Sequence, residues 1–128
     1  MSRDTINVQY PVLENSQSVA TTAITKTTVT AANGIVIKNA FANKNNTLVI
    51  CIENTASSAA NVTFLAGDAY PNSMLGDLKV SIPTKTLNAF QVQDMARFEN
   101  KDGSVNIDFA STFTGNIFVI AKSADLNK

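Results

Sequence analysis

Short apolar runs with a period of two, separated by turn-forming pairs, make up most of this sequence. Val105, Ile107 and Phe109, for example, alternate with polar residues and follow the pair Asp102-Gly103. Such alternation is typical of half-buried strands, and Asp-Gly or Asn-Gly pairs favour tight turns because both residues tolerate positive φ. No stretch keeps the helical period over the roughly ten residues of an average helix. The chain is therefore expected to fold into sheets.

About eight short strands are predicted, and their number and spacing indicate an all-β fold, either an antiparallel β-sandwich or a small barrel. One helical turn is allowed near residues 94–97, with Asp94 as its N-cap. Asn33-Gly34 is expected to join the first two strands in a hairpin, and Thr114-Gly115-Asn116 to turn the chain before the last strand. The predicted strands are residues 19–32, 35–37, 48–54, 61–64, 78–82, 87–93, 105–109 and 117–121.

The composition agrees with a protein of strands and turns. Thr and Asn account for 14 and 15 of the 128 residues, and they suit strands and turns respectively. Charged residues are only 16%, so little charge repulsion opposes association with other molecules. The aromatic core is expected to come from the seven phenylalanines, Phe41, Phe64, Phe90, Phe98, Phe109, Phe113 and Phe118.

Several classes of function are excluded by what the chain lacks. Without His there is no Ser–His or Cys–His dyad and no His-ligated metal, and a single Cys forms neither an internal disulfide nor a Cys-based zinc site. Ten basic residues balance ten acidic ones, without the basic block of a nucleic-acid binder. No apolar run approaches the ~20 residues of a membrane span. We therefore expect no enzyme, no cofactor, and neither a nucleic acid nor a membrane as partner.

The remaining polar groups give no catalytic constellation. Asp68 and Asp77 flank a loop that could hold Ca²⁺ with backbone carbonyls, but no Asp-x-Asp-x-Asp-Gly pattern is present, which favours loop carboxylates and turn caps. Arg97 is expected to bond backbone carbonyls or pair with an Asp, with recognition of a partner's carboxylate as the alternative. Cys51 lies in the most apolar run and is expected to be a buried residue of a central strand covered on both faces.

The N-terminal residues are too apolar for a purely solvated tail. We predict that residues 1–18 form an extended arm that adds to the sheet edge of a partner, with Ile6, Val8, Tyr10 and Val12 as its partner-binding residues. A frayed terminus is the other interpretation. The β-sandwich domain is then expected to span residues 19–122, followed by a short polar tail at residues 123–128.

The second half of the chain contains the segments IENTASSAANVTFLAGDAYPNSMLGDLKVSIP, VQDMARFENKDGSVNIDF and FTGNIFVIAKS. The informative positions in them are Glu53-Asn54-Thr55, Gly67-Asp68, Leu75-Gly76-Asp77-Leu78, Pro83, Arg97-Phe98, Asp102-Gly103-Ser104-Val105 and Thr114-Gly115. On these residues the chain resembles small structural proteins of tailed bacteriophages, in particular capsid-decoration (head) proteins of phages that infect Gram-positive bacteria. The resemblance spans roughly residues 50–121.

This resemblance implies a non-enzymatic virion protein, made in the host cytoplasm, that binds the major capsid protein on the outer surface of the head and stabilises the lattice. A single reduced Cys agrees with assembly in the cytoplasm. Further copies of the same chain, in a homo-oligomer, are a second possible partner. One alternative is a carbohydrate-binding or host-adhesion module of a phage tail or baseplate, which would need exposed aromatic residues or a Ca²⁺ site in its loops. Another is a tail-tube or tail-completion protein that self-assembles into rings.

Overall fold

The computed structural model describes residues 3–13, 20–38, 40, 48–68, 76–91 and 95–121. The alternating runs become strands, and the predicted helical turn becomes one turn of 3-10 helix, η1 (Met95–Phe98). The strands are β1 (Asp4–Asn7), β2 (Val12–Leu13), β3 (Ala20–Thr21), β4 (Thr27–Thr28), β5 (Ile35–Lys38), β6 (Val49–Asn54), β7 (Ala60–Phe64), β8 (Leu78–Ile82), β9 (Thr86–Phe90), β10 (Val105–Phe109) and β11 (Gly115–Ile120).

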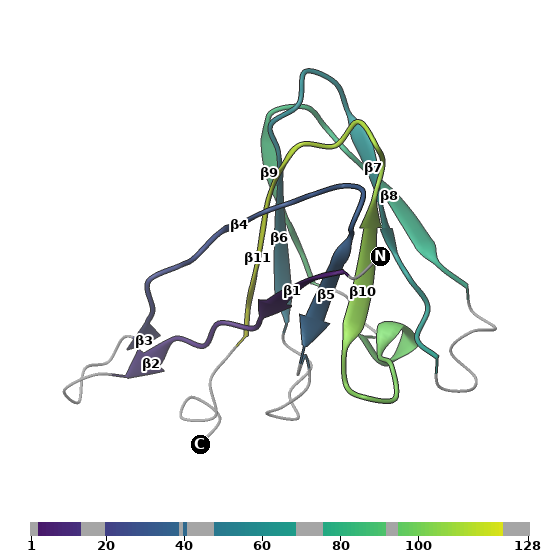
Figure 1. Ribbon diagram of the computed structural model, residues 1–128. Helices are drawn as coiled ribbons and strands as arrows, with labels where there is room; N and C mark the ends of the chain where they lie inside the picture. The colour runs from purple at the N-terminus through teal and green to yellow at the C-terminus, as the bar shows by residue number, and fades with distance from the viewer. Residues whose placement is uncertain are drawn as a thin grey trace.

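Nine of these strands form two packed sheets, which confirms the predicted β-sandwich (Figure 1). The five-stranded sheet has the order β1-β5-β10-β7-β8, and the four-stranded sheet the order β4-β11-β6-β9. Neighbouring strands are antiparallel except for β1, which pairs with β5 in parallel. The strands β2 and β3 form a separate two-stranded sheet.

The core lies between the two sheets and is supplied by the inward residues of the alternating strands. Val105, Ile107 and Phe109 of β10 are buried, as their spacing predicts. Four of the seven phenylalanines are buried, and Phe90 packs against the core from its rim. The Phe64 ring lies edge-on to two others, 5.5 Å from Phe90 and 5.9 Å from Phe98 between centroids. Phe41 lies outside the described residues.

The central strand predicted around Cys51 is confirmed, but its predicted cover on both faces is not, because Val49 and Glu53 on the outer face are only half-buried. Strand β6 has β11 on one side and β9 on the other, and Ile50, Cys51 and Ile52 are all buried. At its end, the fully buried Asn54 donates from Nδ2 to the carbonyls of Ser58 and Ile82, both at 3.1 Å, and accepts from the Ala56 N–H at 2.9 Å. Because Ile82 ends β8, this one side chain ties the two sheets together.

The hairpin predicted across Asn33-Gly34 is wrong, although the turn itself is present. The N–H groups of Asn33 and Gly34 both bond the Thr30 carbonyl, and Gly34 has φ of 72°. This turn carries the chain from β4 in the four-stranded sheet to β5 in the five-stranded sheet. Turn residues specify a local reversal, but they do not specify that the flanking strands pair with each other.

Three further expectations about individual segments need correction. The strand predicted at residues 19–32 is not continuous, because within the described residues 20–32 only β3 and β4 have pairing neighbours and residues 23–26 between them are exposed. Residues 114–116 do not turn: Gly115 and Asn116 already belong to β11, and the turn bond runs from the Phe113 N–H to the Ala110 carbonyl. Phe118 lies on the face of β11 opposite to the buried Ile117 and Val119, so it is only half-buried.

Candidate functional site

Three of the four residues predicted to bind a partner lie against the protein's own core. Ile6 of β1 is 5% exposed, and Val8 and Tyr10 are partly buried against the same cluster. Burial raises the pKa of the Tyr10 hydroxyl. Val12 lies elsewhere, in β2, opposite Thr21 of β3. Residues 4–10 are thus part of the sandwich, and the partner-binding role expected of them stays a prediction.

Gln9 marks the point at which the chain leaves the sandwich. Its N–H bonds the Val119 carbonyl at 2.9 Å, and its carbonyl accepts from the Ala121 N–H at 3.0 Å, so that Gln9 lies beside the end of β11, while β4 pairs with the start of the same strand. Its side-chain amide forms two more bonds with the backbone of Thr25, both at 2.9 Å. The segments on either side of β2 and β3 are therefore held together at this base. The residue spacing around Gln9 carried no signal of this role.

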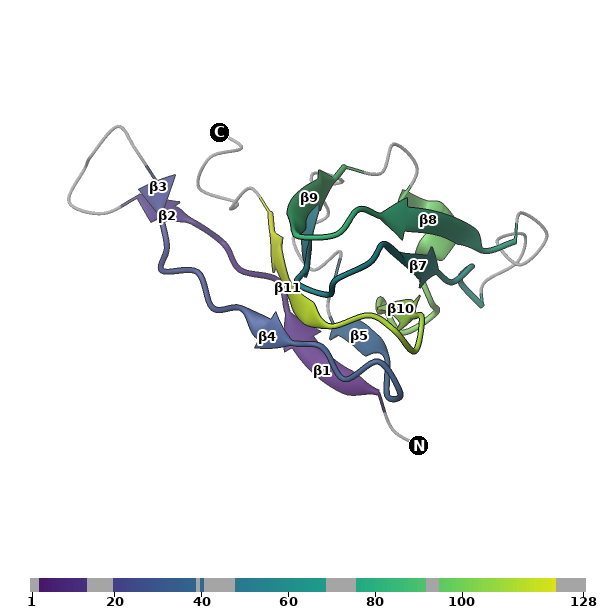
Figure 2. The ribbon, with the colours of Figure 1, turned by 90° about the horizontal axis from the view of Figure 1, so that it is seen from above.

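Beyond this base, β2 and β3 project from the sandwich (Figures 1 and 2). We call this two-stranded antiparallel sheet, residues 12–13 and 20–21, the projecting ribbon. Val12 pairs with Thr21 and Leu13 with Ala20. Among the described residues, these strands pair only with each other. An isolated two-stranded sheet is marginally stable in water at best, so contact with another surface would stabilise the ribbon.

A groove of about 290 Å³ lies beside the base of the ribbon. It is formed by the edge strands β1 and β4 together with β11, so each sheet contributes to it. Its lining is mainly hydroxyl and amide side chains over a small apolar floor: Thr5, Ile6, Asn7, Gln9, Thr25, Thr27, Ile117 and Phe118. The groove offers hydrogen-bonding groups to an extended chain, and none of the described residues that line it is charged.

A second and more open hollow, of about 570 Å³, includes one of the two proposed calcium ligands. Asp68 accepts a hydrogen bond from the Lys101 N–H at 2.7 Å, and Asp77 accepts one from the Ala66 N–H at 2.7 Å. Both carboxylates thus cap backbone groups, as the turn-cap interpretation predicted. Within the described part of the chain, no group of three or more His, Cys, Asp or Glu side chains is placed to hold a metal ion.

Arg97 and Cys51 have the structural roles that the sequence predicted. The Arg97 guanidinium donates to the Gly76 carbonyl from Nη2 at 3.0 Å and from Nε at 3.3 Å, and it lies 5.1 Å from the centre of the Phe98 ring. The Cys51 thiol is free and buried, and burial raises its pKa. A high thiol pKa lowers the thiolate fraction, which makes Cys51 a poor nucleophile.

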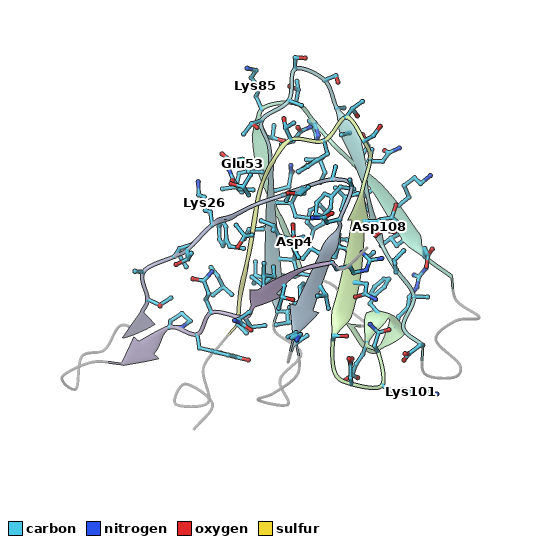
Figure 3. The ribbon with its side chains drawn as sticks, in the orientation of Figure 1. Asp4, Lys26, Glu53, Lys85, Lys101 and Asp108 are labelled. Atoms are coloured by element: carbon cyan, nitrogen blue, oxygen red, sulfur yellow. The ribbon has the colours of Figure 1, made fainter. Side chains whose placement is uncertain are left out.

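A small polar network lies on the outer face of the four-stranded sheet, where Figure 3 labels Lys26 and Glu53. Asn116 donates to Glu53 at 3.1 Å, and the Lys26 ammonium lies 3.5 Å from the same oxygen. The Asn116 hydrogen bond, followed by the charge of Lys26, lowers the pKa of Glu53. This carboxylate is therefore ionised at neutral pH and serves to join β4, β6 and β11.

Comparisons with protein-family models, with curated proteins and with solved structures find no match to this chain. No helix among the described residues is long and apolar enough to cross a membrane. The sandwich, its surfaces and the projecting ribbon are therefore the features that bear on function.

Proposed function

We propose that this protein is a non-enzymatic virion component of a tailed bacteriophage, a capsid-decoration protein that binds the outer surface of the head. Its partner is the major capsid protein, and its effect is to hold neighbouring capsid subunits together. Repetition over the lattice multiplies a modest affinity at each site, because linked binding sites act at a high effective concentration.

The projecting ribbon is the observation that carries this proposal. It extends away from the sandwich on a base held by four hydrogen bonds of Gln9. A small sheet that gains little stability on its own is suited to insertion against a neighbour, where its free strand edges can pair. The ribbon replaces the arm at residues 1–18 as the element proposed to contact the capsid.

The positions that carry the resemblance to phage decoration proteins support the proposal from the opposite half of the chain. Among the described ones, Asn54 ends β6, Asp102 lies in the turn before β10 and Thr114 directly precedes β11. In the described part of the sandwich the thiol is buried, and the carboxylates of Asp68 and Asp77 cap backbone N–H groups. A rigid domain with a projecting binding element fits a structural role better than a catalytic one.

Deleting the ribbon tests the proposal more cleanly than truncating the terminus. Loss of residues 1–18 would also remove β1 and the core residue Ile6. Val12 pairs with Thr21, so their Cα atoms are about 5 Å apart, and a Gly-Gly link can join Pro11 to Thr22. We expect this variant to fold. Its occupancy on heads assembled from the major capsid protein of the same phage should decrease about tenfold or more.

Two controls accompany the deletion. Circular dichroism and thermal melting should show that the sandwich is intact, and Lys79→Ala, in β8 at the far edge of the five-stranded sheet, should bind heads like the natural chain. Electron cryo-microscopy of decorated heads should then place the protein on the outer surface, with density for the ribbon against a capsid subunit. Full occupancy of the deletion variant would overturn the role of the ribbon.

The open hollow beside Asp68 favours a second candidate, a carbohydrate-binding module for host adhesion. Its lining also includes Asn100, Asp102, Ser104 and Asn106, and amide and carboxylate groups of this kind hydrogen-bond sugar hydroxyls. A glycan array probed with the full chain, with and without Ca²⁺, separates the two candidates. Binding that is abolished by Asn106→Ala would favour this module over a lattice stabiliser.

A further inference from the structure

The sandwich has two edge strands on the side away from β1 and β4, namely β8 in the five-stranded sheet and β9 in the four-stranded sheet (Figure 2). An edge strand presents a row of backbone N–H and C=O groups along its open side, which makes it a template for pairing with another chain. Natural edges are usually protected by a charge, a proline, a bulge or a very short length. The two edges differ sharply in this respect.

Strand β8 carries such protection and β9 does not. In β8, Lys79 is exposed within the strand and Pro83 follows its last residue. Strand β9 reads Thr-Leu-Asn-Ala-Phe, without a charge or a proline, and pairs with β6 over five consecutive residues. It is therefore a regular, uncharged edge.

Strand β9 also exposes apolar side chains next to that edge. Leu87 is 53% exposed, the largest exposure of any bulky apolar residue among those described, and Ala89 on the same face is exposed as well. Leaving a leucine in water forgoes the free energy that its burial would provide. An uncharged edge flanked by an exposed leucine is the arrangement of a strand-pairing interface rather than of a protected surface.

We propose that β9 pairs with β9 of a second copy of this chain, antiparallel about a two-fold axis at Asn88, which joins the two four-stranded sheets into one. In this register Leu87 lies opposite Ala89 of the second copy, and residues directly opposite share a face with Cβ atoms about 5 Å apart. Thr86 lies opposite Phe90, and Lys85 opposite the amide of Gln91.

Charge favours a second copy over a charged partner strand. No position from residue 85 to residue 91 places like charges opposite each other in this register, because Lys85 is the one charged residue of the segment. The whole chain has a net charge of zero, so no long-range repulsion opposes self-association. A strand bearing charges would find no complement on β9. This pairing does not depend on the proposed function, although a dimer would present two projecting ribbons at once.

Sedimentation equilibrium of the full chain tests the pairing and its register. We expect a reversible dimer with a Kd below ~100 μM. The double variant L87K/A89K should be monomeric, because it places lysines opposite lysines. The variant L87K/A89E should restore the dimer, because each introduced lysine then lies opposite an introduced glutamate. The matched control is Ile24→Lys, which changes a residue 41% exposed outside β9, and it should leave the Kd unchanged.

Each other outcome overturns the proposal. A monomeric natural chain at high concentration would contradict it directly. A dimer that tolerates L87K/A89K, or one that L87K/A89E fails to restore, would mean a different interface or a different register. A monomeric chain whose binding to heads is lost in L87K/A89K would instead assign the β9 edge to the capsid protein. Because the ribbon-deletion test uses capsid occupancy and this one uses self-association, the two proposals fail independently.

Discussion

Single residues set the closest approaches in this sandwich, and Gly115 is the clearest case. It begins β11 opposite Asn54, with φ of 156°, and a Cβ added there would overlap the backbone carbonyl oxygen of Glu53. Because that oxygen belongs to the central strand, it cannot move aside as a flexible side chain would. The glycine, predicted from sequence as part of a turn, is required by the packing of two strands.

We predict that Gly115→Ala lowers the free energy of unfolding by about 3 kcal/mol or more, since either β11 or β6 must shift. Urea denaturation measures the loss. Gly76→Ala is the matched control, because Gly76 has φ of 75° but open space where a Cβ would lie. That control isolates the left-handed backbone conformation and should cost about 1 kcal/mol. Equal losses in the two variants would contradict the steric explanation.

Asp102 links stability to pH at the residue scale. Its carboxylate accepts from the Ser104 hydroxyl at 2.6 Å and from the Ser104 N–H at 3.1 Å, and these bonds lower its pKa below the usual 3.8. A group whose pKa is lower in the folded than in the unfolded chain stabilises the fold above the unfolded value. This contribution is lost as the pH falls through the lowered pKa.

We therefore predict that Asp102→Ala is less stable than the natural chain at pH 7, and that the difference shrinks as the pH falls below the usual Asp value of 3.8. Chemical denaturation of both proteins between pH 7 and pH 2 measures the difference in their free energies of unfolding. Lys101→Ala at the neighbouring exposed position serves as the control for changes in the turn. A difference that stays constant down to pH 2 would show that Asp102 acts through packing rather than through its charge.

At the scale of elements, β1 determines how much of the N-terminal segment can be removed without damage to the sandwich. It lies at the edge of the five-stranded sheet beside β5, and Arg3 before it reaches across Gly34 to the Asp108 side chain at 2.5 Å. The apolar residues of the N-terminal segment predicted that it would contact a surface. They did not predict which surface, because an internal sheet and a partner's sheet offer the same pairing groups.

We predict that Ile6→Ala costs about 3 kcal/mol of stability, as expected for a core isoleucine that is 5% exposed. The matched Ile24→Ala, at a residue 41% exposed near the ribbon, should change stability by less than ~0.5 kcal/mol. Thermal and urea unfolding of the two variants measure the contrast. A small effect at Ile6 would mean that β1 is an arm only loosely attached to the sandwich.

Other elements show why some predictions succeeded and others failed. The alternation in β10 and the continuous apolar run of β6 identified these strands, because burial on one or both faces leaves a local pattern. The threonine-rich stretch at residues 19–32 has high strand propensity along its whole length, yet pairs only at β3 and β4. Propensity does not supply a neighbouring strand, and without a neighbour the backbone groups of a strand stay unpaired.

At the scale of the whole molecule, the chain crosses between the two sheets at several points, and these crossings define its surfaces. The segment that follows β1, up to Gln9, and the β4–β5 turn cross on the side of the groove, while Pro83–Lys85 joins β8 to β9 on the other. One side therefore carries the projecting ribbon and its base, and the other carries two open edges. A head-binding element and a self-pairing edge would lie on separate sides and could act together.

The sequence by itself determined the fold class, most strand positions, the buried Cys51 and the absence of His-based chemistry, because these depend on residue type and on local periodicity. The tertiary structure alone decided that β4 and β5 join different sheets, that β1 enters the sandwich, that β2 and β3 project from it, and that β9 is an unprotected edge. The physical reason is that sheet membership depends on pairing between residues far apart in the chain, such as Thr28 with Asn116 and Asp4 with Ile35. Many such pairings satisfy the same alternating pattern, and only packing of the complete core selects one of them.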